Sequence, residues 1–339
     1  MGLLRYAFTR VLLTLPMVLI LLTVVFLVLH VMPGNPVLVI LGGRNVPVAL
    51  IHQYEHRLGF DQPIYVQYAR YLWGVVHGNL GESFSSGMSV TSQIALHLPA
   101  TLELSFSGLF IAGLIGVSTG VWAALRQGGY VDQILRFTHI GTYAIPIFWS
   151  GLMLQMVFGI FLKWLPTGLQ LNPVSAAFFQ PITGFVVLDA LLRGQWALLG
   201  QALEHLLLPA FTLGLALSGL VGRVTRAALI EVLDLDYVRT ARAKGLPARA
   251  MVLKHALRNA LIPIITVVGI QFAILMGGAV LTEAVFSWPG IGSFLLQSIK
   301  ARDFNAIQGT VVVIAILIAT VNLIVDLCYA LVDPRVRFS

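Results

Sequence analysis

Two short patterns in the chain combine residue types that could do chemistry. Gly116-Val-Ser-Thr-Gly120 fits the G-x-S-x-G pattern of serine hydrolases, and His52 and His56 have the spacing of helical metal ligands. The serine pattern needs a strand-to-helix turn with an acid and a histidine to follow, but it lies inside an apolar run. Glu55 does not take the second position of H-E-x-x-H, and no third ligand is evident. We therefore expect no catalytic residue and no metal ligand, and a solvated helix face for the histidines.

The sequence contains no P-loop for a nucleotide. The pattern G-x-x-x-x-G-K-[ST] cradles phosphates with backbone N–H groups and a lysine. None of the lysines follows a glycine; they are Lys163, Lys244, Lys254 and Lys300. If the protein moves a solute with ATP, a separate chain must bind the ATP and Mg²⁺, and we expect no cofactor on this chain.

Composition places the chain in a membrane. Of its 339 residues, 58% are hydrophobic and only 10% are charged, and the mean hydropathy is +0.89. A soluble domain usually carries about 25% charged residues, so this chain could not cover the surface of a water-soluble fold. The excess apolar surface must face lipid. The single cysteine, Cys328, excludes an intrachain disulfide.

Uncharged apolar runs predict an all-α, polytopic membrane protein with about six transmembrane helices. A span needs roughly 20 apolar residues, and it must be helical because unpaired backbone groups are costly in hydrocarbon. The runs cover residues 11–32, 104–125, 137–162, 206–222, 259–282 and 304–325. The first run lacks a small-x-small cleavage site, so we expect an uncleaved first helix. Residues 164–188 are also uncharged, but three prolines interrupt them, which indicates a loop or a partly embedded hairpin.

Basic residues predict the orientation, because cytoplasmic loops carry an excess of Lys and Arg. With six spans, 14 of the 21 Lys and Arg lie on the side of both termini, and eight of them fall within residues 222–262. We therefore expect both termini in the cytoplasm. A seven-span alternative that uses residues 164–188 would put the termini on opposite sides. The apolar runs that flank the basic stretch argue against nucleic acid as its partner.

Few ionisable residues lie near the predicted spans. They are Glu103, His139, Glu204, His205 and Asp326. All but His139 fall near the end of a span, where water can reach them, and His139 is either a deep polar group or also close to the inner surface. Ionisable groups deep in a membrane mark ion and proton pathways, and a proton-coupled transporter would need more of them. The pattern weighs against a secondary transporter.

Small residues recur at every fourth position in three of the spans. Residues at i and i+4 share a helix face, and small residues there let two backbones approach closely. The pattern predicts a packed bundle whose helices can slide or rock, and it is equally compatible with static packing. The positions that we single out for helix packing or a pore are Gly116, Gly120, Gly214, Ser218, Gly269 and Gly277.

The stretch Asp236-Tyr-Val-Arg-Thr-Ala-Arg-Ala-Lys-Gly-Leu246 lies between the fourth and fifth spans. Asp234 or Asp236 can cap a helix there, and Gly245 is a natural stop. Pro247 is then expected to begin a second short helix. Two short polar helices between spans indicate a docking element for a cytoplasmic partner. The alternative is a basic loop that rests on anionic lipid.

This stretch and several others resemble the permeases of ABC importers, in their dipeptide and oligopeptide form. Residues 237–246, followed by His255-Ala-Leu-Arg-Asn-Ala-Leu-Ile-Pro263, are similar to the EAA loop of those permeases. The other similar stretches are Pro33-Gly-Asn-Pro36, Leu58-Gly-Phe-Asp-Gln-Pro63, Gly78-Asn-Leu-Gly81, Ala100-Thr-Leu-Glu-Leu104, Pro146-Ile-Phe-Trp149, Leu208-Pro-Ala210, Thr282-Glu-Ala-Val-Phe-Ser-Trp-Pro-Gly-Ile-Gly292, Arg302-Asp-Phe304 and Gln308-Gly309. The resemblance covers nearly the whole chain and is to the B-type permease subunit, which has a large loop after its first span.

The sequence departs from the general EAA pattern at several positions. Arg239-Thr-Ala241 stands where Glu-Ala-Ala is usual, and Leu257-Arg258 replaces a distal Leu-Pro. The peptide branch tolerates both changes, so the resemblance still implies the fold and the coupling, but not a salt bridge from the missing Glu. Asn35 and Asn79 stand where Asp is frequent, which lowers the local negative charge.

The resemblance implies the permease subunit of an ATP-driven importer in a prokaryotic inner membrane, with the type I ABC-importer permease fold. The implied partners are a second, homologous permease, two cytoplasmic ATPases and an extracytoplasmic peptide-binding protein. Dipeptides or oligopeptides are the implied cargo, and nickel chelates, glutathione and oligosaccharides are alternatives. The competing classes are a secondary transporter, an intramembrane hydrolase and a membrane scaffold.

The resemblance also implies how the chain is divided and which role each candidate residue has. Residues 1–32 would be the first transmembrane helix, 33–99 the extracytoplasmic loop, and 100–339 the permease core with its coupling loop 223–262. The ATPase-coupling residues would be Asp236, Tyr237, Arg239, Thr240, Ala241, Arg242, Ala243, Lys244, Gly245, Leu246, His255, Arg258 and Asn259. The residues that dock the binding protein would be Tyr65, Tyr68, Tyr71, Trp73 and Trp288.

Overall fold

The computed structural model describes residues 3–31, 37, 46–247 and 250–332, and in this part of the chain the fold is helical. The α-helices are α1 (Leu3–Val31), α3 (Val48–Leu58), α4 (Ile64–Val76), α5 (Val90–Leu125), α6 (Tyr130–Ala144), α7 (Ile147–Leu154), α8 (Pro173–Phe178), α9 (Val186–Leu192), α10 (Trp196–Leu233), α11 (Asp236–Ala243), α13 (Leu257–Gly278), α14 (Val280–Val285), α15 (Ile291–Ala301) and α16 (Phe304–Val332). Two π-helical segments are η1 (Gln155–Phe161) and η2 (Met251–Ala256). Extended pairing within these residues is limited to an isolated bridge between Glu82 and Ser89. The all-α prediction is confirmed.

Long apolar helices correspond to the predicted spans. Four are long and apolar enough to cross a membrane: α5, α10, the helix over residues 254–275, and residues 304–325 of α16. The bent pair of α6 with α7–η1 can form a fifth, and α1 adds a shorter apolar stretch, Leu12–Val28. The expected number of about six spans corresponds to these elements.

The third span is not the straight helix that residues 137–162 predict. The axes of α6 and α7–η1 meet at 99°. Pro146 causes the break, because a proline disfavours the helical conformation of the residue before it, and Ile145 lies at φ −76°, ψ 129°. Residues 164–188, which follow η1, form loops, α8 and the start of α9 rather than another long helix.

The fourth and fifth spans differ from the prediction at their ends. α10 is one helix of 38 residues and extends past the predicted 206–222 on both sides. The second short helix expected after Pro247 is not separate, because η2 runs directly into α13. Residues 248–249, and the similar stretch at 33–36 with Asn35, lie outside the described residues.

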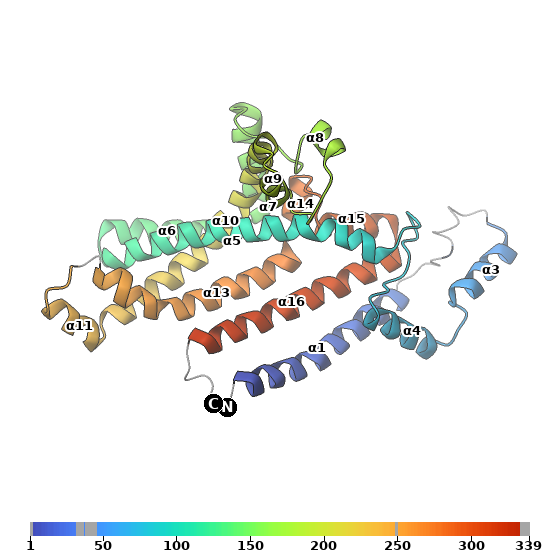
Figure 1. Cartoon of the computed structure of the whole chain (residues 1–339), viewed down its shortest axis with the longest axis horizontal. Helices are drawn as coiled ribbons and strands as arrows, with labels where there is room; N and C mark the ends of the chain where they lie inside the picture. The colour runs from blue at the N-terminus through green and yellow to red at the C-terminus, as the bar shows by residue number, and fades with distance from the viewer. Residues whose placement is uncertain (1–2, 32–36, 38–45, 248–249, 333–339) are drawn as a thin grey trace.

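Close packing of α5 on α10 forms the centre of the bundle (Figure 1). A Cβ on Gly116 would come within 2.7 Å of the Val221 side chain, and a Cβ on Gly214 within 2.5 Å of Ile111. Neither position has room for a side chain. The small-residue positions in this interface are Gly108, Gly116 and Gly120 of α5 and Gly214, Ser218 and Gly222 of α10.

A second close approach joins α13 to α16. A Cβ on Gly269 would overlap the side chain of Val325. Gly277 also lies in α13, but its surroundings are outside what the structure describes. A pore-lining role for the small residues of α5, α10 and α13 stays a prediction.

The two ends of the bundle carry different elements. Figure 1 shows that the beginning of α1, the end of α16 and α11 lie toward one end, whereas α3, α4 and α15 lie toward the other. Both ends of the described chain are thus on the same side of the apolar bundle as α11, as an even number of spans requires.

Candidate functional site

α11 is a short helix with a defined stop. It follows α10 after two residues and ends at Ala243. Gly245 has φ 76°, a left-handed conformation that glycine adopts without strain. The Leu246 N–H donates to the carbonyl of Ala241 at 3.3 Å, which is the longer-range bond of a Schellman motif. The glycine stop that the sequence predicts is confirmed.

Polar and apolar contacts hold α11 against α10 and the start of α13. The Tyr237 hydroxyl accepts a hydrogen bond from Asn259 Nδ2 at 2.6 Å and lies 3.5 Å from the carbonyl oxygen of His255. Val238 is fully buried in a cluster with Leu229 of α10 and with residues of η2. The structure therefore brings together three members of the predicted set, and α11 contacts α10, η2 and the start of α13.

The outer face of α11 is exposed and basic. Arg239 Nη1 lies 3.8 Å from Asp236, but both side chains are mostly in solvent, so this pair holds neither group in place. The exposed members of the predicted set are Asp236, Tyr237, Arg239, Thr240, Ala243, Lys244, Gly245, Leu246, Arg258 and Asn259. Ala241 and His255 are half-buried, and the side chain of Arg242 is not among those described. This face can receive acidic groups of another protein.

A buried carboxylate organises the turn between α14 and α15, a role that the sequence analysis missed. Glu283 is fully buried and accepts hydrogen bonds from the Thr101 hydroxyl at 2.6 Å and the Ser293 N–H at 2.8 Å. A Cβ on Gly290 would overlap the carboxylate. Burial raises the pKa of Glu283 above its ordinary 4.5, and the hydrogen bonds from Thr101, Ser293 and a neighbouring backbone N–H offset only part of this. The carboxylate accepts at the first turn of α15, where backbone N–H groups lack helical partners.

Trp288 does not belong to the docking surface that the sequence analysis assigned it to. Its side chain is 1% exposed, and its Nε1–H donates to the Ala100 carbonyl of α5 at 2.8 Å. An internal carbonyl satisfies a buried indole N–H as well as a partner protein would. Trp288 therefore packs the α14–α15 turn onto α5, and the assignment is corrected.

Only two of the four aromatic residues predicted for docking on α4 face solvent. Tyr65 is 72% exposed and Trp73 is 69% exposed. The Tyr68 hydroxyl lies 2.5 Å from the Thr23 hydroxyl of α1, and Tyr68 and Tyr71 both pack against a phenylalanine of that helix. These two tyrosines fix α4 to α1, which leaves Tyr65 and Trp73 as the surface that a partner could contact.

A second buried carboxylate ties the loop after α4 to the start of α16. Asp303 Oδ2 accepts from the Ser83 hydroxyl at 2.6 Å and from the N–H and hydroxyl of Ser85 at 2.9 Å. Burial alone would raise the pKa of Asp303, but these hydrogen bonds and one from the Ala306 N–H outweigh it, and the pKa lies below its ordinary 3.8. The loop is thus held in one place relative to the bundle.

The hydrogen bonds that Asp303 accepts from the loop after α4 predict that the stability of the fold depends on pH. Because the folded-state pKa is lowered, the stabilisation is complete above the ordinary value of 3.8 and is lost as the pH falls through the folded-state value. Asp303→Asn should lower the melting temperature of the detergent-solubilised protein at neutral pH, and the two proteins should converge as the pH falls below 3.8. Equal melting temperatures at neutral pH would contradict a stabilising role of the Asp303 hydrogen bonds.

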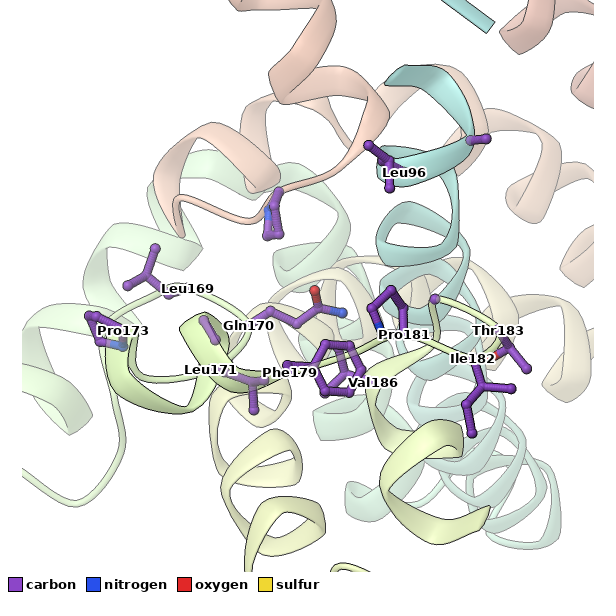
Figure 2. A pocket seen from close by; sticks show the side chains of 14 residues that line it. Leu96, Leu169, Gln170, Leu171, Pro173, Phe179, Pro181, Ile182, Thr183 and Val186 are labelled. Atoms are coloured by element: carbon purple, nitrogen blue, oxygen red, sulfur yellow. The ribbon is translucent and has the colours of Figure 1, made fainter. Parts of the chain in front are cut away.

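A pocket of about 680 Å³ lies between the first turns of α5 and the loop over residues 169–186 (Figure 2). Its walls are mostly apolar, and its described lining includes no charged side chain. Glu103 supports one wall from behind, because it accepts from Gln170 Nε2 at 2.7 Å and from the Val187 N–H at 2.8 Å. Asp189 supports another by accepting from Thr183. The pocket is therefore a pre-formed, uncharged concavity.

The serine of the G-x-S-x-G pattern lies inside α5, and His52 and His56 both lie on the exposed surface of α3. Ser118 donates to the Leu114 carbonyl inside α5 rather than standing on a strand-to-helix turn. His52 lies 3.0 Å from Glu55 on the exposed face of α3. Among the residues that the structure describes, no three His, Cys, Asp or Glu side chains gather as metal ligands would.

The apolar helical bundle, with an exposed and sharply stopped basic helix at one end, defines the class of the protein as a multi-pass membrane permease. The chain belongs to the family of inner membrane components of binding-protein-dependent transport systems. The model of that family matches residues 116–338, and the model of the N-terminal part of such membrane components matches residues 3–105.

Several relatives match nearly the full length of the chain. The di/tripeptide transport system permease protein DppB of Pseudomonas aeruginosa is 43% identical, with 92% of each chain covered. The dipeptide transport system permease protein DppB of Alkalihalophilus pseudofirmus is 39% identical over 99% of this chain and 100% of its own. The glutathione transport system permease protein GsiC of Pectobacterium atrosepticum is 35% identical over 99% of this chain and 100% of its own.

Proposed function

We propose that this chain is the permease subunit of an ATP-driven importer of dipeptides and related short peptides, and that it forms half of the translocation path. A second, homologous permease would supply the other half, and two separate cytoplasmic ATPases would bind ATP and Mg²⁺. The observation that carries the proposal is α11, because it is sharply stopped, exposed on a basic face and held against two spans at once. The relatives named for dipeptide transport support peptides as the cargo, and the relative named for glutathione supports the alternative.

In this proposal α11 is the coupling helix and sits in a groove of one ATPase. Closure of the ATPases around ATP would push α11, and α10 and α13 would rock with it. The bundle would then switch between inward and outward access. The excess of Lys and Arg supports a cytoplasmic location for α11 and both termini, and α4, α15 and the loop after α4 would then face the extracytoplasmic space.

Reconstitution with the partner subunits tests the function directly. The complete complex in proteoliposomes should import a short peptide when its binding protein is supplied on the outer side and ATP is present at the ATPases. Uptake by this chain alone under an ion gradient would favour a secondary transporter instead. Wild-type peptide uptake in cells that lack this chain would favour a scaffold.

The exposed aromatics of α4 should contact the extracytoplasmic binding protein. A photo-crosslinking amino acid in place of Trp73, which is 69% exposed, should yield a covalent product with the binding protein. The same amino acid in place of Tyr130, which is 86% exposed and is the first residue of α6, on the side assigned to the cytoplasm, should not. Repeated absence of a product at both Trp73 and Tyr65 would show that α4 is purely structural.

A further inference from the structure

The bent helix pair α6–α7–η1 connects the neighbourhood of α11 with the turn that Glu283 organises. Its first turn lies on α10, toward the end of the bundle that carries α11 (Figure 1). After the 99° bend, Gln155 Nε2 of η1 donates to the Val285 carbonyl at 2.9 Å. Gly151 of α7 lies against Phe286, where a Cβ would be 3.1 Å from the ring. This bent pair, residues 130–161, is called the arm below. It lies on α10 at its first turn and again at Gly151, which faces Thr212, and beyond the bend it contacts the α14–α15 turn.

An ion pair between a buried carboxylate and a half-buried guanidinium joins the first turn of this arm to α10. Arg226 Nε lies 2.5 Å from Asp132 Oδ1, and Arg226 Nη2 lies 2.7 Å from Asp132 Oδ2. The Asp132 side chain is 2% exposed and that of Arg226 is 21% exposed. Asp132 also accepts from the Gly128 N–H at 3.0 Å, in the loop that leads into the arm. Two parallel bonds to a planar guanidinium resist both sliding and rotation of one helix on the other.

Packing above the ion pair keeps the arm on the same face of α10. A Cβ on Gly219 would overlap the carbonyl of His139, and a Cβ on Gly222 would overlap its ring. The His139 Nε2 atom lies 2.9 Å from the Thr119 hydroxyl of α5. Helices α5, α6 and α10 are thus joined as one unit at this level, and the ion pair lies where the unit is nearest to α11 along α10.

We infer that the Asp132–Arg226 ion pair fixes the arm to α10, so that a displacement of α11 is transmitted to the α14–α15 turn. Both are positioning residues, because they act through the helices that they join. Arg226 lies on α10, ten residues before Asp236, the first residue of α11. Only two residues separate the end of α10 from the start of α11. The inference rests on the proposed function, since α11 receives a push only if it is the coupling helix.

The test measures peptide imported per ATP hydrolysed by the complete complex in proteoliposomes. Asp132→Asn leaves Arg226 without its counter-ion, and the ratio should fall at least about tenfold, a loss equivalent to about 1.4 kcal/mol. ATP hydrolysis should stay within about twofold, because the ATPases are separate chains. The matched control is Glu231→Gln, an exposed acid on α10, which should leave the ratio unchanged.

The double variant Asp132→Asn with Arg226→Gln separates coupling from folding. Removing one partner of a buried pair strands a charge, whereas removing both does not. The double variant should therefore assemble like the wild type and still be uncoupled. A wild-type ratio in the double variant would overturn the inference, and so would its failure to assemble, because the pair would then serve folding alone. If the wild-type complex imports no peptide, the proposed function fails instead.

Discussion

Gly245→Val is expected to reduce ATP-driven peptide uptake at least about tenfold while the chain still inserts and assembles. Gly245 lies at φ 76°, and a β-branched residue in this left-handed conformation costs about 1–3 kcal/mol. Among the residues that the structure describes, no atom lies within 4 Å of the position that a Cβ would take, so the cost comes from the backbone conformation. The backbone turn that ends α11 would no longer be fixed. The basic face of α11 would then lose its fixed orientation on α10 and α13. The measurement is uptake per assembled complex in proteoliposomes, together with ATP hydrolysis.

Gly245→Asn is the matched control for this prediction. Asparagine visits the left-handed region more readily than other non-glycine residues and serves as a helix stop. It should therefore keep most of the uptake that valine loses, although its side chain is of similar size. Equal uptake by the wild type and the valine variant would show that the stop of α11 does not carry coupling.

The largest loss of stability is expected from Gly290→Ala. The added methyl group would overlap the Glu283 carboxylate, which is fully buried. Overpacking costs about 1–3 kcal/mol, and displacement of the carboxylate from Thr101 and Ser293 adds the cost of unpaired buried polar groups. We expect a destabilisation of about 3 kcal/mol or more in total. Thermal unfolding of the purified protein in detergent, followed by tryptophan fluorescence, measures it, because Trp288 is buried beside this turn.

Gly141→Ala provides the comparison. Gly141 lies inside α6, and no atom of the described part of the chain comes within 4 Å of its Cβ position. Alanine there should be neutral or stabilising by up to about 1 kcal/mol, because it has the higher helix propensity. If Gly290→Ala melts at the same temperature as Gly141→Ala, the packing of Gly290 against the Glu283 carboxylate is not as tight as the structure indicates.

The features predicted well from the sequence are those whose causes are local. Apolar runs and proline-rich loops follow from composition, and the stop at Gly245 follows from a glycine after a short polar helix. The bend at Pro146 is different. Pro99, Pro209 and Pro263 all lie inside helices that continue, so a proline alone does not tell which helix breaks. Neighbouring helices decide, because they satisfy or leave unsatisfied the backbone groups that the proline frees.

The roles of Glu283 and Trp288 depend on partners that are distant in the sequence. Glu283 accepts from Thr101, which lies 182 residues earlier, and Trp288 donates to Ala100, 188 residues earlier. No periodicity or cap signal reports such contacts. The closely spaced Gly290 and Gly292 were the available hint, since close glycines in a loop mark tight backbone approach. The Asp132–Arg226 pair was equally hidden, because Arg226 lies 94 residues after Asp132.

The importer proposal depends on the claim that α11 faces the cytoplasm, and cysteine labelling tests this claim most directly. In a background where the native Cys328 is replaced by serine, Ala243→Cys places a thiol on the exposed part of α11. A membrane-impermeant maleimide added to intact cells should leave Ala243→Cys unlabelled and should label it after the membrane is permeabilised. Tyr65→Cys, at the opposite end of the bundle, should be labelled in intact cells. Labelling of Ala243→Cys from outside intact cells would place α11 away from the ATPases and contradict the account.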